Sequence, residues 1–175
     1  MSKYPQAYVE YLVFFHAHRD YFECHEVMEE YWKNHPEDPL SRAYVGLIQT
    51  AVAMYHQRRG NFKGAVKMLD SARELLTKDR LERLGIDADA FTTILEQRSK
   101  QLHSKEPAPF TDLDIPLADD ELYRECLEQC GKQQLIWSAP SNGDNESLIH
   151  KHTLRDRSDV IEARARELYL RQKRG

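Results

Sequence analysis

Apolar positions recur every three to four residues through most of the first hundred residues, which is the spacing of helices with one apolar face. Proline, aspartate, asparagine and glycine residues interrupt this pattern where helices usually begin or end. The pattern predicts five helices, which cover approximately residues 5–18, 20–34, 40–59, 62–84 and 87–103. The sequence therefore predicts an all-α fold in which residues 1–104 form a compact bundle of about five helices.

The rest of the chain has a different pattern. Residues 105–118 contain three prolines and few apolar runs, so we expect a linker that follows the surface of the bundle. Residues 119–175 are expected to form a smaller, mainly helical C-terminal appendage. It would contain a short acidic helix that Gly131 ends and a last helix that Ser158 caps. Two short apolar runs, 134–137 and 148–150, flank a turn-rich segment and are compatible with a short β-hairpin.

The predicted second helix carries charged groups between aromatic residues. At about 100° per residue, one face contains Phe22, His25, Glu26, Glu29 and Trp32. The two aromatic residues predict that this face points toward the core. Carboxylates there are costly unless they are paired, hydrogen-bonded or bound to a metal. We therefore expect the histidine and the two glutamates to be buried and to have partners.

The predicted third helix can supply those partners. Its residues Gln49 and His56 lie on one stripe, and they would face the second helix if the two helices pack antiparallel. Arg59 could reach a glutamate as a bidentate partner. This arrangement predicts a buried polar network that fixes the register of the two helices. The network would consist of His25, Glu26, Glu29, Gln49, His56 and Arg59.

A divalent metal site is the alternative interpretation of the same residues. His25 and Glu29 are four residues apart, and imidazole and carboxylate ligands from facing helices bind metals in other bundles. However, the spacing completes neither the Glu-x-x-His pair of diiron bundles nor the His-Glu-x-x-His motif of zinc proteases. We favour the network and keep as the alternative a metal-dependent hydrolase that uses His25, Glu26, Glu29 and His56.

Three blocks of sequence resemble a known family. The blocks are Phe-Glu-Cys-His-Glu-Val-Met-Glu-Glu-Tyr-Trp at 22–32, Gly-Leu-Ile-Gln-Thr-Ala at 46–51, and Tyr-His-Gln-Arg-Arg-Gly-Asn at 55–61 with Gly-Ala at 64–65. In order and spacing they are similar to domain-of-unknown-function family 309, over roughly residues 10–80. The resemblance implies a compact all-helical fold in bacteria or archaea, and it implies no established activity. The structural residues of these blocks are Phe22, Trp32, Gly60, Asn61, Gly64 and Ala65.

Composition narrows the function classes. The net charge of −4 predicts no general attraction to nucleic acid or to a membrane surface. The first residues of the sequence show no cationic region followed by an apolar run, and no stretch has the length and apolar content that a membrane span needs. The three cysteines are odd in number and are not expected to form a disulfide framework. We therefore expect a cytoplasmic protein. The favoured function is a non-enzymatic protein-interaction or small-ligand-binding module, whose partner would be another protein or a second copy of the chain.

Overall fold

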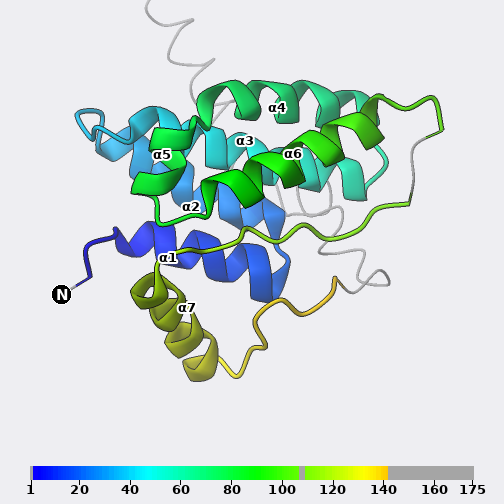
Figure 1. The fold of residues 1–175 in the computed structure, drawn as a ribbon. Helices are drawn as coiled ribbons and strands as arrows, with labels where there is room; N and C mark the ends of the chain where they lie inside the picture. Colours follow the sequence, from blue (N-terminus) through cyan, green and yellow to red (C-terminus); the bar gives the residue numbers. More distant parts are fainter. Residues whose placement is uncertain (1, 107–108, 142–175) are drawn as a thin grey trace, which may run out of the picture.

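The protein folds as a stack of helices, and the predicted all-α class is confirmed. A computed structural model describes residues 2–106 and 109–141. The helices are α1 (Gln6–Val13), α2 (Tyr21–Asn34), α3 (Ser41–Arg58), α4 (Phe62–Leu75), α5 (Lys78–Arg83), α6 (Ala88–His103) and α7 (Asp120–Lys132). A π-helical turn, η1 (Phe14–His18), continues α1. Helix α3 packs against α2 and α4, α4 packs against α6, and α1 packs against α2 and α7 (Figure 1).

The helix ends follow the local signals in the sequence. Asp20 accepts a hydrogen bond from the backbone N–H of Glu23, and Asp87 caps α6 in the same way. The predicted helix over 62–84 is divided, however. Leu76 and Thr77 leave the helical conformation, and the Thr77 hydroxyl caps a separate α5. A threonine inside an apolar pattern can start a new helix because its side chain satisfies an amide at the helix N-terminus.

On α2 the core forms on a different face from the one predicted. On α2 the buried residues are Tyr21, Cys24 and Met28, and not the face that contains His25. Both faces carry aromatic residues at helical spacing, so periodicity alone did not distinguish them. Phe22 and Trp32 are only partly buried and pack against the core from its edge. Helix α3 is buried over most of its circumference, because α2 and α4 cover it from two sides.

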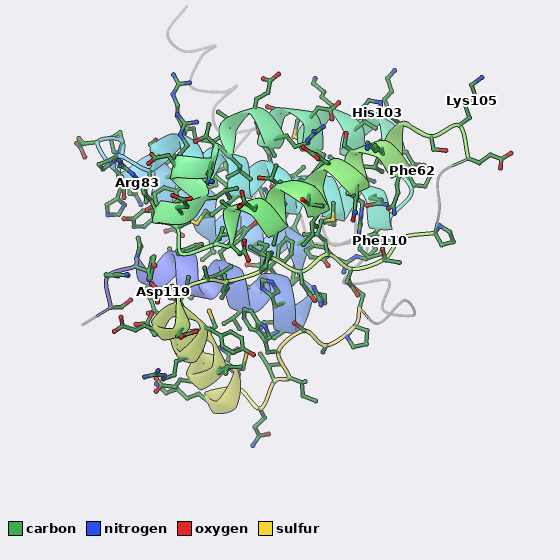
Figure 2. All side chains as sticks on the ribbon, in the orientation of Figure 1. Phe62, Arg83, His103, Lys105, Phe110 and Asp119 are labelled. Atoms are coloured by element: carbon green, nitrogen blue, oxygen red, sulfur yellow. The ribbon has the colours of Figure 1, made fainter. Side chains whose placement is uncertain are left out.

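Residues 109–119, here called the strap, run along the bundle from Phe110 to Asp119 (Figure 2). Leu113 and Ile115 of the strap are buried, as are Leu122 and Cys126 of α7, and all four belong to the same hydrophobic core as the helices of the bundle. The strap and α7 thus share the core of the bundle. Whether residues 1–104 and 119–175 fold separately, as the division into bundle, linker and appendage predicts, remains a prediction.

In the C-terminal part, α7 ends at a different residue from the one predicted. Gly131 lies within α7 and does not end it; the chain instead turns at Gln134, which has a φ of 57°. Among the described residues, β pairing is confined to one isolated bridge between Ile86 and Leu117. The second run of the predicted hairpin and the helix predicted after Ser158 lie outside the described residues. Within residues 2–106 and 109–141, no helix has the length and apolar content that a membrane span requires.

Candidate functional site

The predicted polar face of α2 forms a partly exposed cluster. The His25 ring donates from Nδ1 to the carbonyl of Phe22 at 2.6 Å, because a carbonyl can only accept. Its Nε2 lies 3.6 Å from Glu26 and 3.9 Å from Glu29. Lys33 adds a contact of 3.1 Å to Glu29. The predicted partners on α2 therefore do meet.

Burial of this cluster differs from the prediction. The side chains of His25, Glu26 and Glu29 are 19%, 43% and 34% exposed, respectively. The reason is the orientation of α2, whose Tyr21 face and not its His25 face is turned into the core. Water therefore solvates the two carboxylates in part, and the high cost of a buried charge does not apply to them.

Of the predicted polar residues of α3 and its C-terminal end, His56 lines a small hollow between α2 and α3. The hollow has a volume of about 160 Å³ and is lined by Phe22, His25, Val52, Tyr55 and His56. His25 and His56 thus share one hollow, as the antiparallel packing implied. In the described part of the chain Arg59 lies over the Tyr55 ring, 5.5 Å from its centroid.

Two residues of the predicted network each carry a buried polar atom that makes no hydrogen bond within the part of the chain that the structure describes. Gln49 Oε1 and Arg59 Nε are buried, and they have no hydrogen-bond partner among the described residues. Arg59 was predicted to reach a glutamate of α2, but the ion pairs that the structure gives for Glu29 involve His25 and Lys33. The contacts described join His25 with Glu26 and Glu29, and a network that includes all six residues remains a prediction.

The metal interpretation gains no support from the geometry. Within residues 2–106 and 109–141, no three histidine, cysteine, aspartate or glutamate side chains are grouped so that they could hold a metal ion. His56 Nδ1 lies 3.4 Å from the amide of Asn61, and His25 Nδ1 contacts a carbonyl. One nitrogen of each imidazole is thus engaged by the protein.

The structural residues of the family blocks form the turn between α3 and α4. Gly60 ends α3 with a φ of 87°, a conformation that side chains rarely adopt. Asn61 then caps α4 by accepting from the Gly64 N–H at 3.0 Å. A Cβ on Gly64 would lie 2.7 Å from the Asn61 amide nitrogen, so a larger residue there would displace the capping side chain. Ala65 is fully buried, which lets α4 approach α3 closely.

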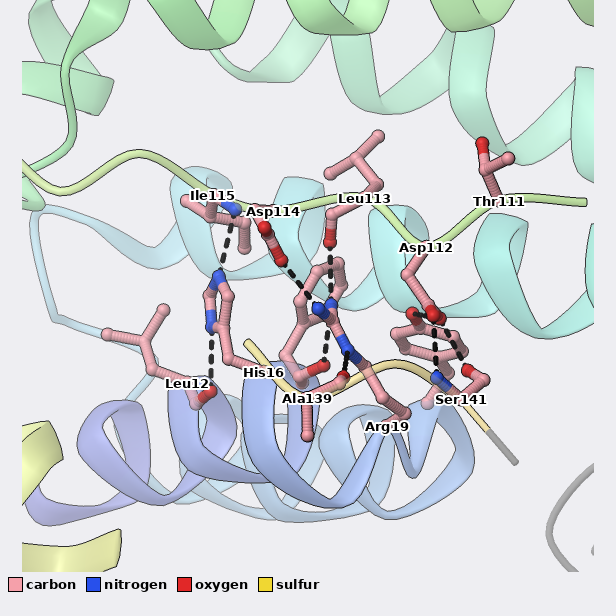
Figure 3. A network of polar contacts seen from close by, with 12 residues as sticks. Leu12, His16, Arg19, Thr111, Asp112, Leu113, Asp114, Ile115, Ala139 and Ser141 are labelled. Carbon is pink, nitrogen blue, oxygen red and sulfur yellow. Dashed lines mark hydrogen bonds and ion pairs between the residues drawn. The ribbon is translucent and has the colours of Figure 1, made fainter. Parts of the chain in front are cut away.

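Sequence reasoning did not identify a second polar cluster, which fastens the strap to the bundle (Figure 3). Arg19 is 3% exposed, and its backbone has a φ of 52°. Its guanidinium donates to the carbonyls of Leu113 at 3.1 Å and Ala139 at 2.7 Å, and it pairs with Asp114 at 2.7 Å. Arg19 and its neighbours end a predicted helix, where charged residues are usual, so no sequence signal marks them.

Asp112 is the anionic counterpart in this cluster. Burial acts to raise its pKa, but hydrogen bonds from the Ser141 hydroxyl and amide and from Tyr21, together with the charge of Arg19, hold the pKa below its usual value. Arg58 donates to the Arg19 carbonyl at 2.6 Å and to Ser141 at 3.1 Å. The cluster therefore joins η1, α2, α3, the strap and the residues after α7, and its groups are engaged in holding these segments together.

His16 completes the attachment of the strap. The backbone N–H of Ile115 donates to Nε2 of His16 at 2.8 Å, so Nε2 must be unprotonated, and Nδ1 donates to the Leu12 carbonyl at 2.8 Å. The ring is fully buried and stacks on Trp137 with the centroids 4.1 Å apart. Burial lowers the pKa of His16 to about 4.

Two surface features remain. Three large apolar side chains are exposed among the described residues: Tyr123 and Leu127, each 40% exposed, and Ile136, 75% exposed. A cleft of about 850 Å³ opens at the end of the bundle where the N-terminal residues, the α2–α3 turn, α5 and the start of α7 meet. Neither feature was predicted from the sequence, because each depends on segments that are distant along the chain.

Comparison with known proteins gives a family and no activity. A family model described as "Domain of unknown function (DUF309)" matches residues 8–68. The chain is also 41% identical over 172 residues to the uncharacterized protein YpuF of Bacillus subtilis (strain 168), an alignment that covers 97% of this chain and 98% of YpuF. No solved structure matches the chain. Because the alignment with YpuF extends over nearly all of both chains, this protein belongs to the DUF309 family.

Proposed function

We propose that this chain is a non-enzymatic protein-interaction module that pairs with a second copy of itself through α7. The observation that carries the proposal is the position of the exposed apolar side chains. Tyr123 and Leu127 are one turn apart on α7, and Ile136 is next to Trp137, whose ring packs edge-on against Tyr123. Grouped exposed apolar side chains are typical of protein-interaction surfaces.

The charges on the outer face of α7 favour a second copy as the partner. Asp120, Arg124, Glu128 and Lys132 are exposed at four-residue spacing beside Tyr123 and Leu127. If two α7 helices pack antiparallel about a two-fold axis near residues 126–127, Asp120 of one copy lies opposite Lys132 of the other. Arg124 lies opposite Glu128 in the same way. A two-fold interface must be complementary to itself, and this charge order satisfies that condition.

The apolar positions suit the same arrangement. With the axis at Leu127, one residue from the centre of the charge pairs, Leu127 lies against Leu127 of the second copy and Tyr123 against Gly131. A Cβ at Gly131 would have no neighbour within 4 Å, so the exposed glycine leaves room for an aromatic ring. One helix face is smaller than a standard interface, so we expect a weak dimer with a dissociation constant of about 1 µM or higher.

Charge reversal tests this pairing. Sedimentation velocity over a concentration series should show a monomer–dimer equilibrium for the unaltered protein. Arg124→Glu and Glu128→Arg should each weaken association, because each places like charges opposite one another. The double variant should restore association, since the swapped charges pair again across the two-fold axis.

Leu127→Asp tests the apolar contact of the proposed interface, and Thr92→Asp on the exposed side of α6 is its control. We expect the first substitution to abolish association and the second to leave it unchanged. A protein that stays monomeric at all concentrations would contradict the proposal. So would a dimer that tolerates both single charge reversals.

A further inference from the structure

Independently of pairing, we propose that the cleft at the end of the bundle binds an organic polycation. The cleft, here called the tyrosine cleft, is lined by Tyr4, Tyr31 and Tyr44 together with Asp38, Glu82 and Asp119. Its volume of about 850 Å³ is within the range of small-molecule sites. Arg83 of α5 and Asp119 at the start of α7 lie at the same end of the molecule (Figure 2).

One wall of the cleft is a tyrosine pair around Asp38. Tyr31 and Tyr44 each donate a hydroxyl hydrogen to the same Asp38 oxygen at 3.2 Å. The other oxygen accepts from the Leu40 amide at 2.8 Å. The two rings meet edge to face with centroids 5.4 Å apart, and His35 stacks on Tyr31. Burial and the nearby carboxylate raise the pKa of Tyr44, so its hydroxyl stays protonated.

A second part of the lining is built around Asp119. This carboxylate accepts from the Tyr4 hydroxyl at 2.5 Å, pairs with Lys3 at 2.9 Å and caps α7. A Cβ on Gly85 would lie 2.5 Å from the Tyr4 hydroxyl, so the position of Tyr4 depends on that glycine. Both parts of the lining are thus fixed by contacts within the protein.

These contacts decide which ligand chemistry the cleft can accept. All three tyrosine hydroxyls donate their hydrogen to a carboxylate, so each can only accept a hydrogen bond from a ligand. Lys3 is paired with Asp119, and Arg83 with Asp79 at 3.1 Å. Asp38 accepts three hydrogen bonds and retains room for a fourth. The cleft therefore presents acceptors and negative charge, and it needs a ligand with several N–H donors.

An extended amine cation has the required properties. Its ammonium groups can donate to Asp38, Glu82 and the tyrosine oxygens, and its methylene groups can lie along the tyrosine rings. Cations bind favourably near the faces of aromatic rings as well. An anion would meet unfavourable charge. A compact metal ion would need several converging carboxylates, and in the described residues no such group exists.

Spermidine is the probe for the experiment. Isothermal titration of the full chain at low salt should show saturable binding of one spermidine, with Kd rising as salt is added. Asp38→Asn should weaken affinity about tenfold, as expected for the loss of a charge-assisted hydrogen bond. Glu82→Gln should also weaken it, and because Glu82 is exposed this variant does not disturb the fold.

Glu96→Gln is the matched control, since it removes one exposed carboxylate on α6 outside the cleft. Its affinity for spermidine should equal that of the unaltered chain. Magnesium chloride added at equal charge should leave most of the spermidine bound. Equal losses in Glu82→Gln and Glu96→Gln, or full displacement by magnesium, would indicate general ion condensation and overturn the proposal. Absence of binding would overturn it directly.

Discussion

A single buried imidazole connects the strap to the first helix of this protein. His16 is held in its neutral form because Nε2 accepts from the Ile115 amide while Nδ1 donates to Leu12. A protonated ring has two donors and no acceptor, so it cannot keep the bond from Ile115. Among its charged neighbours, Asp114 favours protonation, whereas Arg19 and burial oppose it.

This arrangement predicts a loss of stability in acid. The pKa of His16 is lowered from 6.5 to about 4 by folding, so the unfolded chain takes up its proton first as pH falls. The contribution to stability is complete above about pH 6.5 and is lost as pH falls through about 4. The shift corresponds to about 3 kcal/mol in the free energy of unfolding. Urea titrations followed by tryptophan fluorescence should show this fall, because Trp137 stacks on the ring.

His16→Gln should remove this part of the pH dependence, whereas His18→Gln should keep it, since His18 is only partly buried. Equal pH dependence in the two variants would show that other groups are responsible.

Residue-scale prediction from the sequence succeeded for contacts within α2 and failed for its environment. His25 meets Glu29 because side chains four residues apart are neighbours on the surface of any helix. Whether water reaches them depends on how α2 is rotated about its axis. That rotation is set by α1 and α3, and Phe22 and Tyr21 give equally plausible apolar stripes. Local sequence therefore fixes the contacts and leaves the burial undetermined.

At the scale of elements, helix limits followed from caps that act within a few residues. Asp20, Asn61 and Asp87 each accept a hydrogen bond from the amide three residues further along, so the signal is local. The division between α4 and α5 was missed because Leu76 continues the apolar spacing. Leu76 is buried, and its side chain packs against Gly46 of α3.

This contact predicts a strong effect for a small substitution. A Cβ on Gly46 would lie 2.7 Å from Leu76 Cγ, and the neighbour cannot move freely because it is buried. Gly46→Ala should therefore destabilise the protein by about 1–3 kcal/mol through overpacking, although alanine favours a helix. Thermal and urea unfolding would measure the loss.

Leu76→Ala is the matching change. Alone it should cost about 2–5 kcal/mol by leaving a cavity. Combined with Gly46→Ala it should cost less than the sum of the two, because the new methyl group fills part of the space. Strictly additive costs would indicate that Gly46 and Leu76 do not limit how closely α3 and α4 pack.

At the scale of the whole molecule, the strap determines whether the chain is one folding unit. Its bonds to His16 and Arg19 join positions about a hundred residues apart, and no periodicity or local motif in the sequence could reveal them. The prolines indicated an irregular segment correctly. Composition could not show that Leu113 and Ile115 are buried against the bundle.

Truncation tests the predicted boundary directly. A fragment that ends at Ser104 would lose the strap and α7 and would leave His16 and Arg19 without their acceptors and donors beyond residue 110. Buried polar groups without partners are costly, and the part of the core that Leu113, Ile115 and α7 cover would meet water. We therefore expect this fragment to unfold at a clearly lower temperature than the full chain, or to aggregate.

A fragment that ends at Ser141 keeps all these contacts and is the control. If the shorter fragment retained the helical circular dichroism and melting temperature of the full chain, residues 1–104 would be an independent bundle and the strap would contribute little to its stability.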